Sequence, residues 1–325
     1  MAATPCRLGH RRHPRLHQRN PPHPHHQAIT ANNLGNALQE VRRFDEAITA
    51  HQQARTLFQE AGDRHSEGMA WNNLGLALKE VRRFDEAITA HQQARTRHQE
   101  AGDRHSEGMA WNNLGLALRA VRRFDEAITA HQHALTLYRE VGDSHREGTA
   151  WNNLGNALQE VRRFDEAITA HQHALTLFQE AGDRHSEGMA WNNLGLALRA
   201  VRRFDEAITA HQHALTLYRE VGDSHREGTA WNNLGNALRA VRRFDEAITA
   251  HQHALTLFQE AGDRHSEGTA WNNLGNAVQE VWRLDEAVQC WEQAQAAFTD
   301  TNDLDSVEHV ARLLRGLPSP PEPTL

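Results

Sequence analysis

The stretch WNNLGLALRAVRRFDEAITAHQHALTLYREVGD, residues 111–143, decides the fold of this chain. In its first half Trp111, Leu114 and Leu118 recur at helical spacing, so they define one apolar face and predict a helix over residues 104–120. In its second half Ile128 and Leu135 belong to another apolar set, which begins after VRRF interrupts the pattern. The stretch is therefore interpreted as two amphipathic helices joined by a short turn.

Signals for the ends of both helices surround these apolar faces. Asp103 is placed to cap the first helix, with Ser106 three residues later. Gly142 suits the left-handed conformation that often follows the last residue of a helix, so it marks the end of the second helix. Gly115 and Ala127 are expected where the two backbones approach closely, because only small side chains permit the short end of the ~8–10 Å packing range. The unit is thus a helical hairpin.

This hairpin is repeated along the chain with a period of 40 residues. FDEAITAHQ begins at Phe44, Phe84, Phe124, Phe164, Phe204 and Phe244, and an altered seventh copy begins at Leu284. One hairpin exposes too much apolar surface to be stable alone, so the copies are expected to stack as a solenoid. We predict an all-α protein with a basic, His- and Pro-rich disordered tail over 1–26, seven repeats over 27–300, a capping helix over 301–316 and a Pro-rich disordered tail over 317–325.

The repeated motif resembles that of a known family. The order W-N-N-L-G-L-A-L, F-D-E-A-I and then A-L is similar to the tetratricopeptide repeat (TPR) signature, over about residues 28–300. The long period and the G-D-R/S-H joint resemble the long-helix variety in kinesin light chain, in the spindle adaptor that binds Gα subunits and in bacterial TPR arrays. Arg122 departs from the pattern, since a glycine is usual between the two helices. The resemblance implies a TPR superhelix whose first helices line a concave, peptide-binding groove.

Candidate groove residues lie on one stripe of the first helix. Asn112, Leu116 and Arg119 are spaced four and three apart, so they share a side that faces away from the apolar core set. The resemblance implies that this stripe faces the ligand, and a carboxamide can pair with a peptide backbone whatever its side chains. The candidates are Asn72, Asn112, Asn152, Asn192, Asn232, Asn272, Leu116, Asn156, Leu196, Asn236, Arg119, Arg199 and Arg239. The second asparagine of the motif, such as Asn113, is expected to be a structural hydrogen-bonder.

The chemistry of this stripe indicates a class of partner. Its arginines favour a protein or peptide with acidic residues and apolar anchors, because a guanidinium can grip a carboxylate with two hydrogen bonds. The alternative is a solvated surface that was copied by duplication, since residues 111–150 and 191–230 are identical.

Other chemistries find no support in the sequence. The G-x-x-x-x-G-K-[ST], G-x-S-x-G and H-E-x-x-H motifs are absent, so no catalytic residue and no cofactor are expected. His131 and His133 lie two apart in a helix and point to different sides, so no metal site is expected. The net charge of −7 argues against nucleic-acid binding by the array, although residues 1–26 contain five arginines.

The compartment and the function follow from these patterns. Apolar runs fall short of the ~18 residues of a membrane span, and Cys6 and Cys290 form no disulfide or metal-ligand pattern, so we expect a cytoplasmic protein without a membrane partner. The expected function is a non-enzymatic scaffold or adaptor that binds a peptide segment of another protein in the groove. The alternative is a ligand-sensing or regulatory repeat module of a bacterial nucleotide-binding signalling system. Oligomeric state and partner identity stay open.

Overall fold

The computed structural model of this chain describes residues 24–316, and every regular element in that range is an α-helix. The bounds are α1 Pro24–Glu40, α2 Phe44–Ala61, α3 Arg64–Glu80, α4 Phe84–Ala101, α5 Arg104–Ala120, α6 Phe124–Val141, α7 Ser144–Glu160, α8 Phe164–Ala181, α9 Arg184–Ala200, α10 Phe204–Val221, α11 Ser224–Ala240, α12 Phe244–Ala261, α13 Arg264–Glu280, α14 Leu284–Asp300 and α15 Leu304–Arg315. The all-α prediction is confirmed.

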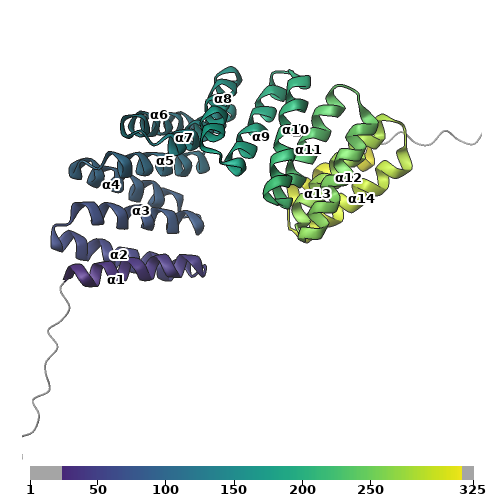
Figure 1. The fold of residues 1–325 in the computed structure, drawn as a ribbon. Coiled ribbons are helices and arrows are strands. Elements are labelled where there is room, and N and C mark those ends of the chain that lie inside the picture. Colours follow the sequence, from purple (N-terminus) through teal and green to yellow (C-terminus); the bar gives the residue numbers. More distant parts are fainter. Residues whose placement is uncertain (1–23, 317–325) are drawn as a thin grey trace, which may run out of the picture.

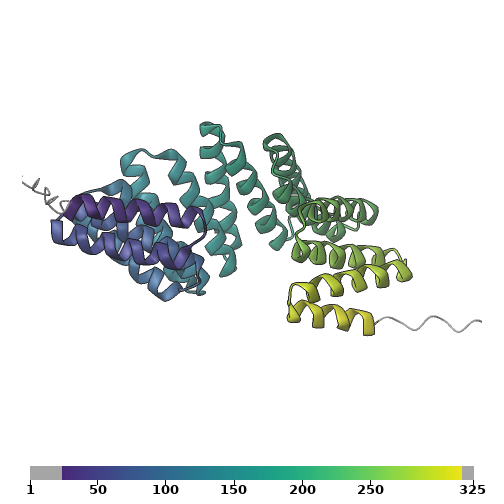
Figure 2. The ribbon, with the colours of Figure 1, turned by 90° about the horizontal axis from the view of Figure 1, so that it is seen from below.

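The helices pair as hairpins that stack along one curved path. Each hairpin joins an odd-numbered first helix to an even-numbered second helix, and every helix packs on the next one in the sequence. The first helices of neighbouring hairpins also contact one another, as α7 contacts α9 and α11 contacts α13. This closer spacing makes the first helices the inner layer of the solenoid. Figures 1 and 2 show the resulting elongated, curved stack, with α1 at one end and α14 near the other.

The helix ends follow the signals in the sequence. Asp103 caps α5, since its Oδ1 accepts a hydrogen bond from the backbone N–H of Ser106 at 3.0 Å. Gly142 follows α6 in the left-handed region, with a φ of 72°. Its N–H donates to the carbonyl of Arg139, and the next N–H donates to the carbonyl of Tyr138, which is the Schellman pattern. Both predicted helix ends are confirmed.

The turn inside each hairpin has the same closure with an arginine in place of glycine. Arg122 has a φ of 62°, its N–H donates to the carbonyl of Arg119, and the N–H of Arg123 donates to the carbonyl of Leu118. The equivalent left-handed residues are Arg42, Arg82, Arg162, Arg202, Arg242 and Trp282. The departure from the family pattern therefore leaves the turn intact, at a cost of ~1–2 kcal/mol for a left-handed residue that carries a side chain.

Alanine, leucine and isoleucine dominate the core between the layers, which forms one large cluster along the array and a small separate one at the first hairpins. Ala127 is fully buried, and Leu114 and Ile128 are 3% and 4% exposed. Gly115 has a different role from the one expected. A Cβ at this position would lie 2.6 Å from Cε1 of His131, so the glycine makes room for an imidazole of the second helix, not for a close backbone.

The ends of the array differ slightly from the predicted boundaries. The first helix begins at Pro24, and at the other end α15 packs against α14. Val310 of α15 is fully buried, whereas Leu304 is 68% exposed. The expectations for residues 1–23 and 317–325 fall outside the described residues. None of the helices within 24–316 is long and apolar enough to cross a membrane.

Candidate functional site

The candidate asparagines belong to hydrogen-bonded units that join neighbouring hairpins. Oδ1 of Asn112 accepts two bonds, from Nδ1 of His131 in the same hairpin and from Nδ2 of Asn153 in the next, both at 3.1 Å. Asn113 in turn donates from Nδ2 to Oδ1 of Asn72 at 3.0 Å. The structural role expected for the second asparagine is confirmed, and it connects α3, α5 and α7 along the inner layer.

The first asparagines are less accessible than the stripe predicted. Exposed fractions are 8% for Asn72 and Asn152 and 9% for Asn192 and Asn232, while Asn112 and Asn272 are half-buried. The first helix of the following hairpin reaches across each of these residues except Asn272 with its own second asparagine. Where Oδ1 is held by both partners, as in Asn152, only Nδ2 is left to meet a ligand.

The histidine that lies 19 residues after the first asparagine is fully buried in each of the first six hairpins. It bonds the asparagine in five of them, whereas Nδ1 of His211 has no hydrogen-bond partner among the described residues. Burial lowers the pKa of His131 and of His171 to about 3, so these rings are neutral. Nε2 of His171 accepts from Nε2 of Gln159 at 2.9 Å. Nε2 of His131 is buried without a hydrogen-bond partner within residues 24–316, because Arg119 replaces the glutamine there. The sequence signal for this pair is an asparagine and a histidine that recur 19 residues apart.

The seventh repeat shows what happens when the pair is broken. Trp291 replaces the histidine, is fully buried, and occupies the space beside Gly275. Oδ1 of Asn272 is then buried without a hydrogen-bond partner in the part of the chain that the structure describes. Asn272 therefore belongs to the candidate set by its position but lies in a different environment from the other asparagines.

Four of the candidate residues meet around one cleft. Leu196 and Arg199 of α9 and Asn236 and Arg239 of α11 line a cleft of about 500 Å³ together with Phe204. Because these side chains come from neighbouring first helices, the cleft opens on the inner layer of the solenoid. The sequence stripe thus predicts which residues gather there.

The charge of this cleft is unbalanced. Arg239 lies 3.8 Å from Oε1 of Glu280, which also lines the cleft. Burial, and secondarily the charge of Arg239, lowers the pKa of Arg199 below its ordinary value. Two guanidinium groups and one carboxylate therefore line this cleft, and the carboxylate is placed near Arg239. Such a place favours an added anion, which would relieve the repulsion between the cations.

The remaining candidates lie at equivalent positions of the preceding first helices, α5 and α7. Leu116 and Arg119 of α5 and Asn156 of α7 are half-buried, as are their counterparts in the cleft. Arg119 lies close enough to His131 for its charge to lower the pKa of that ring further. The stripe is thus continuous in position from α5 to α11, and it is most basic at α9 and α11.

A second row of clefts was not predicted from the sequence. One, of about 520 Å³, is lined by α6, α7 and α8 and contains Trp151 and Asp165; equivalents contain Trp191, Trp231 and Trp271. Trp151 stacks on His173 with ring centroids 4.6 Å apart, and the guanidinium of Arg139 lies 5.1 Å from its ring. The repeated tryptophan thus packs against the core with one part of its ring system and, being half-buried, also lines this cleft.

Known structures share this architecture at low sequence identity. A signal transduction ATPase (STAND) protein with a tetratricopeptide repeat sensor from Pyrococcus horikoshii matches with a TM-score of 0.73 and 13% identity, over 87% of this chain and 44% of its own. This chain thus spans less than half of that protein. A Rap protein complexed with competence and sporulation factor matches with a TM-score of 0.56 and 12% identity, over 90% of this chain and 97% of its own.

A putative kinesin light chain from Podospora anserina, with nearly identical TPR-like repeats, matches with a TM-score of 0.53 and 16% identity, over 62% of this chain and 98% of its own. No curated protein sequence matches this chain significantly. The tetratricopeptide repeat family model matches residues 26–100, 106–180, 146–220, 186–260 and 226–300. Together with the stacked hairpins, these matches show that the chain belongs to the tetratricopeptide repeat family.

Proposed function

We propose that this protein is a non-enzymatic scaffold that binds an acidic peptide segment of a partner along the inner layer, with its main anchor in the cleft between α9 and α11. The observation that carries the proposal is the pair Arg199 and Arg239, which line this cleft together with a single acidic residue, Glu280, among the described residues. A carboxylate of the partner can form two hydrogen bonds with a guanidinium there. Leu196 and Phe204 offer apolar surface beside it.

The asparagines act in this proposal mainly by holding the first helices in register. Oδ1 of Asn152 is occupied by His171 and Asn193, so a peptide backbone would meet Nδ2 alone. The residue four positions later, such as Asn156, is half-buried on the same stripe and keeps its amide available. Recognition is therefore assigned to Leu116, Asn156, Leu196 and Asn236 together with the arginines of the stripe.

The likeness to a repeat sensor of a STAND protein supports a second candidate function. In that case the array would regulate a nucleotide-binding domain by binding a ligand in the same cleft. Both candidates need the cleft, and they differ in the consequence of binding. A cytoplasmic setting fits both, because the described cysteine, Cys290, is a free and buried thiol.

Selection of peptides from a random displayed library tests the proposal. The full chain is the bait, and the enriched peptides are measured by fluorescence anisotropy at low and high salt. We expect acidic peptides with apolar residues, bound more weakly as salt rises. The double variant Arg199→Glu/Arg239→Glu should lose about tenfold or more in affinity, since charged hydrogen bonds contribute about 1.5–3 kcal/mol each.

The matched control is Arg122→Glu/Arg162→Glu, which makes the same change of charge at exposed turns outside the cleft. Circular dichroism should show equal helicity for all variants. Enriched peptides that lack acidic residues, or equal binding by both double variants, would contradict the assignment of the cleft. A binding-dependent change in nucleotide hydrolysis by an added nucleotide-binding partner would favour the sensor role.

A further inference from the structure

One position of the second hairpin breaks the pattern of the array. The six other hairpins carry an aromatic residue at this position: Phe58, Tyr138, Phe178, Tyr218, Phe258 and Phe298. The second hairpin carries His98 instead, and its side chain is as buried as the aromatic ones, at 1% exposure. Nδ1 of His98 is buried without a hydrogen-bond partner among the described residues. A buried polar atom of this kind requires an explanation, because it costs free energy if nothing binds it.

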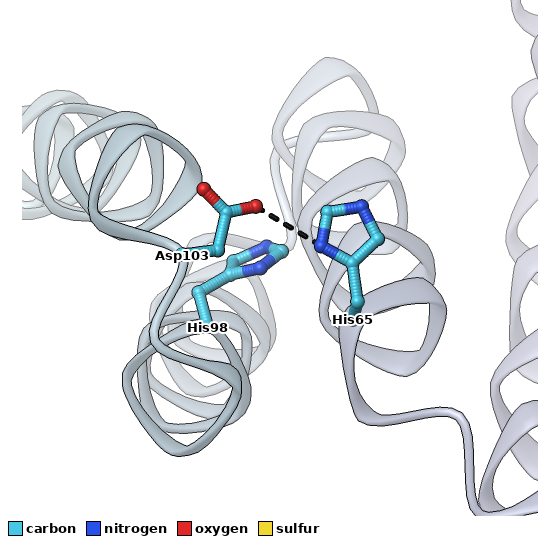
Figure 3. A group of neighbouring side chains, drawn as sticks. All are labelled: His65, His98 and Asp103. Atoms are coloured by element: carbon cyan, nitrogen blue, oxygen red, sulfur yellow. Dashed lines mark ion pairs between the residues drawn. The ribbon is translucent and has the colours of Figure 1, made fainter.

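The surroundings of His98 offer two further donor groups. His65, near the start of α3, places Nδ1 3.0 Å from Oδ2 of Asp103, the residue that caps α5. The rings of His65 and His98 meet edge to face with centroids 5.9 Å apart. Figure 3 shows the two imidazoles and the carboxylate converging at the junction of three helices. One donor atom from each residue lies within 4.8 Å of the other two.

This donor set has the chemistry of a transition-metal site. Two imidazole nitrogens and one carboxylate oxygen are ligands that Zn²⁺ binds at about 2.0–2.2 Å, with a fourth position left for water or another ligand. Oδ1 of Asp103 accepts the backbone N–H of Ser106 at 3.0 Å, which fixes the carboxylate and leaves Oδ2 toward the imidazoles. His65 has a side chain that is 52% exposed, so solvent and ions can reach the group from its side.

We propose that His65, His98 and Asp103 form a binding site for a divalent transition-metal ion of the zinc class, which joins α3, α4 and the start of α5. A bound ion would tie the second hairpin to the third at a position where the other hairpins rely on aromatic packing. The histidine pair considered in the sequence, His131 and His133, is not involved. The site depends on residues from two neighbouring hairpins, so it exists only in the stacked array.

The other hairpins allow a comparison with this site, because they contain the same His–Asp pair without the third ligand. A histidine and an aspartate also pair in the other hairpins, as His105 pairs with Asp143 at 3.0 Å and His145 with Asp183 at 2.9 Å. Their third neighbour is an aromatic ring, Tyr138 or Phe178, which cannot bind a metal ion as an imidazole does. A His–Asp pair is thus present throughout, and the third ligand is specific to the second hairpin.

Titration of the full-length chain with Zn²⁺ by calorimetry, and with Co²⁺ by visible absorption, tests the site. His98→Phe restores the aromatic residue of the other hairpins, so it should remain folded. The wild type should bind one more equivalent of Zn²⁺ than this variant, and His65→Ala should weaken that site by about tenfold or more. Histidines near the amino terminus are common to all these proteins, so their binding cancels in the comparison.

Two further variants sharpen the comparison. His105→Ala removes an equivalent histidine beside Tyr138 and should leave the additional equivalent unchanged. Phe178→His, next to His145 and Asp183, should create a second site and add another equivalent, with helicity checked by circular dichroism. Equal stoichiometry and affinity for the wild type and His98→Phe would overturn the proposal. Loss of the additional equivalent in His105→Ala would also overturn it, because the metal would then bind elsewhere.

Discussion

At the scale of single residues, the repeated asparagine is a buried connector. Asn152 accepts hydrogen bonds from His171 and from Asn193, which come from two different hairpins. His171 is fully buried and cannot find water if the acceptor is removed, whereas Asn193 is half-buried. This arrangement explains why two residues with poor helix propensity recur in the middle of a helix.

Replacing Asn152 by alanine tests this connector. The change leaves Nδ1 of His171 and Nδ2 of Asn193 unpaired, so it should lower the free energy of unfolding by about 1–3 kcal/mol. Asn156→Ala, on the half-buried stripe, should change it by less than about 0.5 kcal/mol. Urea denaturation followed by circular dichroism measures both. If both substitutions changed the free energy of unfolding equally, the hydrogen bonds of Asn152 would make no special contribution to stability.

At the scale of the elements, both helices of a hairpin end in a Schellman motif, but the left-handed residue is an arginine after the first helix and a glycine after the second. Gly182 closes α8 with a φ of 68°, and Arg162 closes α7 with a φ of 62°. The glycine adopts this conformation without strain, whereas in the arginine the Cβ lies too close to the following carbonyl oxygen, which costs conformational free energy. The turn inside the hairpin is therefore the weaker of the two closures.

Substitutions of the left-handed residues Arg162 and Gly182 should change the free energy of unfolding in opposite directions. Arg162→Gly should raise the free energy of unfolding by up to ~1 kcal/mol, because relief of strain exceeds the added entropy of the unfolded chain. Gly182→Ala should lower it by ~1 kcal/mol, although nothing lies within 4 Å of the added Cβ. Thermal unfolding measures both changes. A lower midpoint for Arg162→Gly would mean that its side chain stabilises the turn by more than the strain costs.

At the scale of the whole molecule, the buried histidines make stability depend on pH. Burial lowers the pKa of His51 to about 4 and that of His91, His131, His171, His211 and His251 to about 3, from an ordinary value of 6.5. Below pH 6.5 the unfolded chain gains protons that the folded chain does not bind. Protonation therefore favours unfolding, and stability is lost as the pH falls from 6.5 toward these lowered pKa values.

The thermal midpoint should accordingly fall steeply between pH 6.5 and pH 4.5, because each buried histidine lowers the free energy of unfolding by up to about 1.4 kcal/mol per pH unit. His171→Gln should reduce the slope of this decline, since one titrating ring is removed. His173→Gln, at an exposed position of the same helix, should leave the slope unchanged. A midpoint that is constant over this range would show that the buried rings are protonated in the folded state.

Helix bounds, caps and the stacking period could be predicted from the sequence, because the physical causes lie within a few residues. Asp103 meets Ser106 in the same turn, and Gly142 is left-handed whatever packs nearby. A fixed period of apolar faces also requires stacking, since no single hairpin can bury its own surface. The gathering of Arg199 and Arg239 on one side follows from the 40-residue period, which places them at equivalent positions of neighbouring first helices.

Only the tertiary structure decided which polar residues are buried and what they meet. Asn152 and Asn156 lie on one stripe, yet the following hairpin covers the first and leaves the second half-buried. The grouping of His98 with His65 and Asp103 likewise depends on three helices from two hairpins. Helical periodicity specifies the direction of a side chain on its own helix, whereas burial and contact depend on where the neighbouring hairpin lies. That placement is set by packing between residues far apart in the sequence.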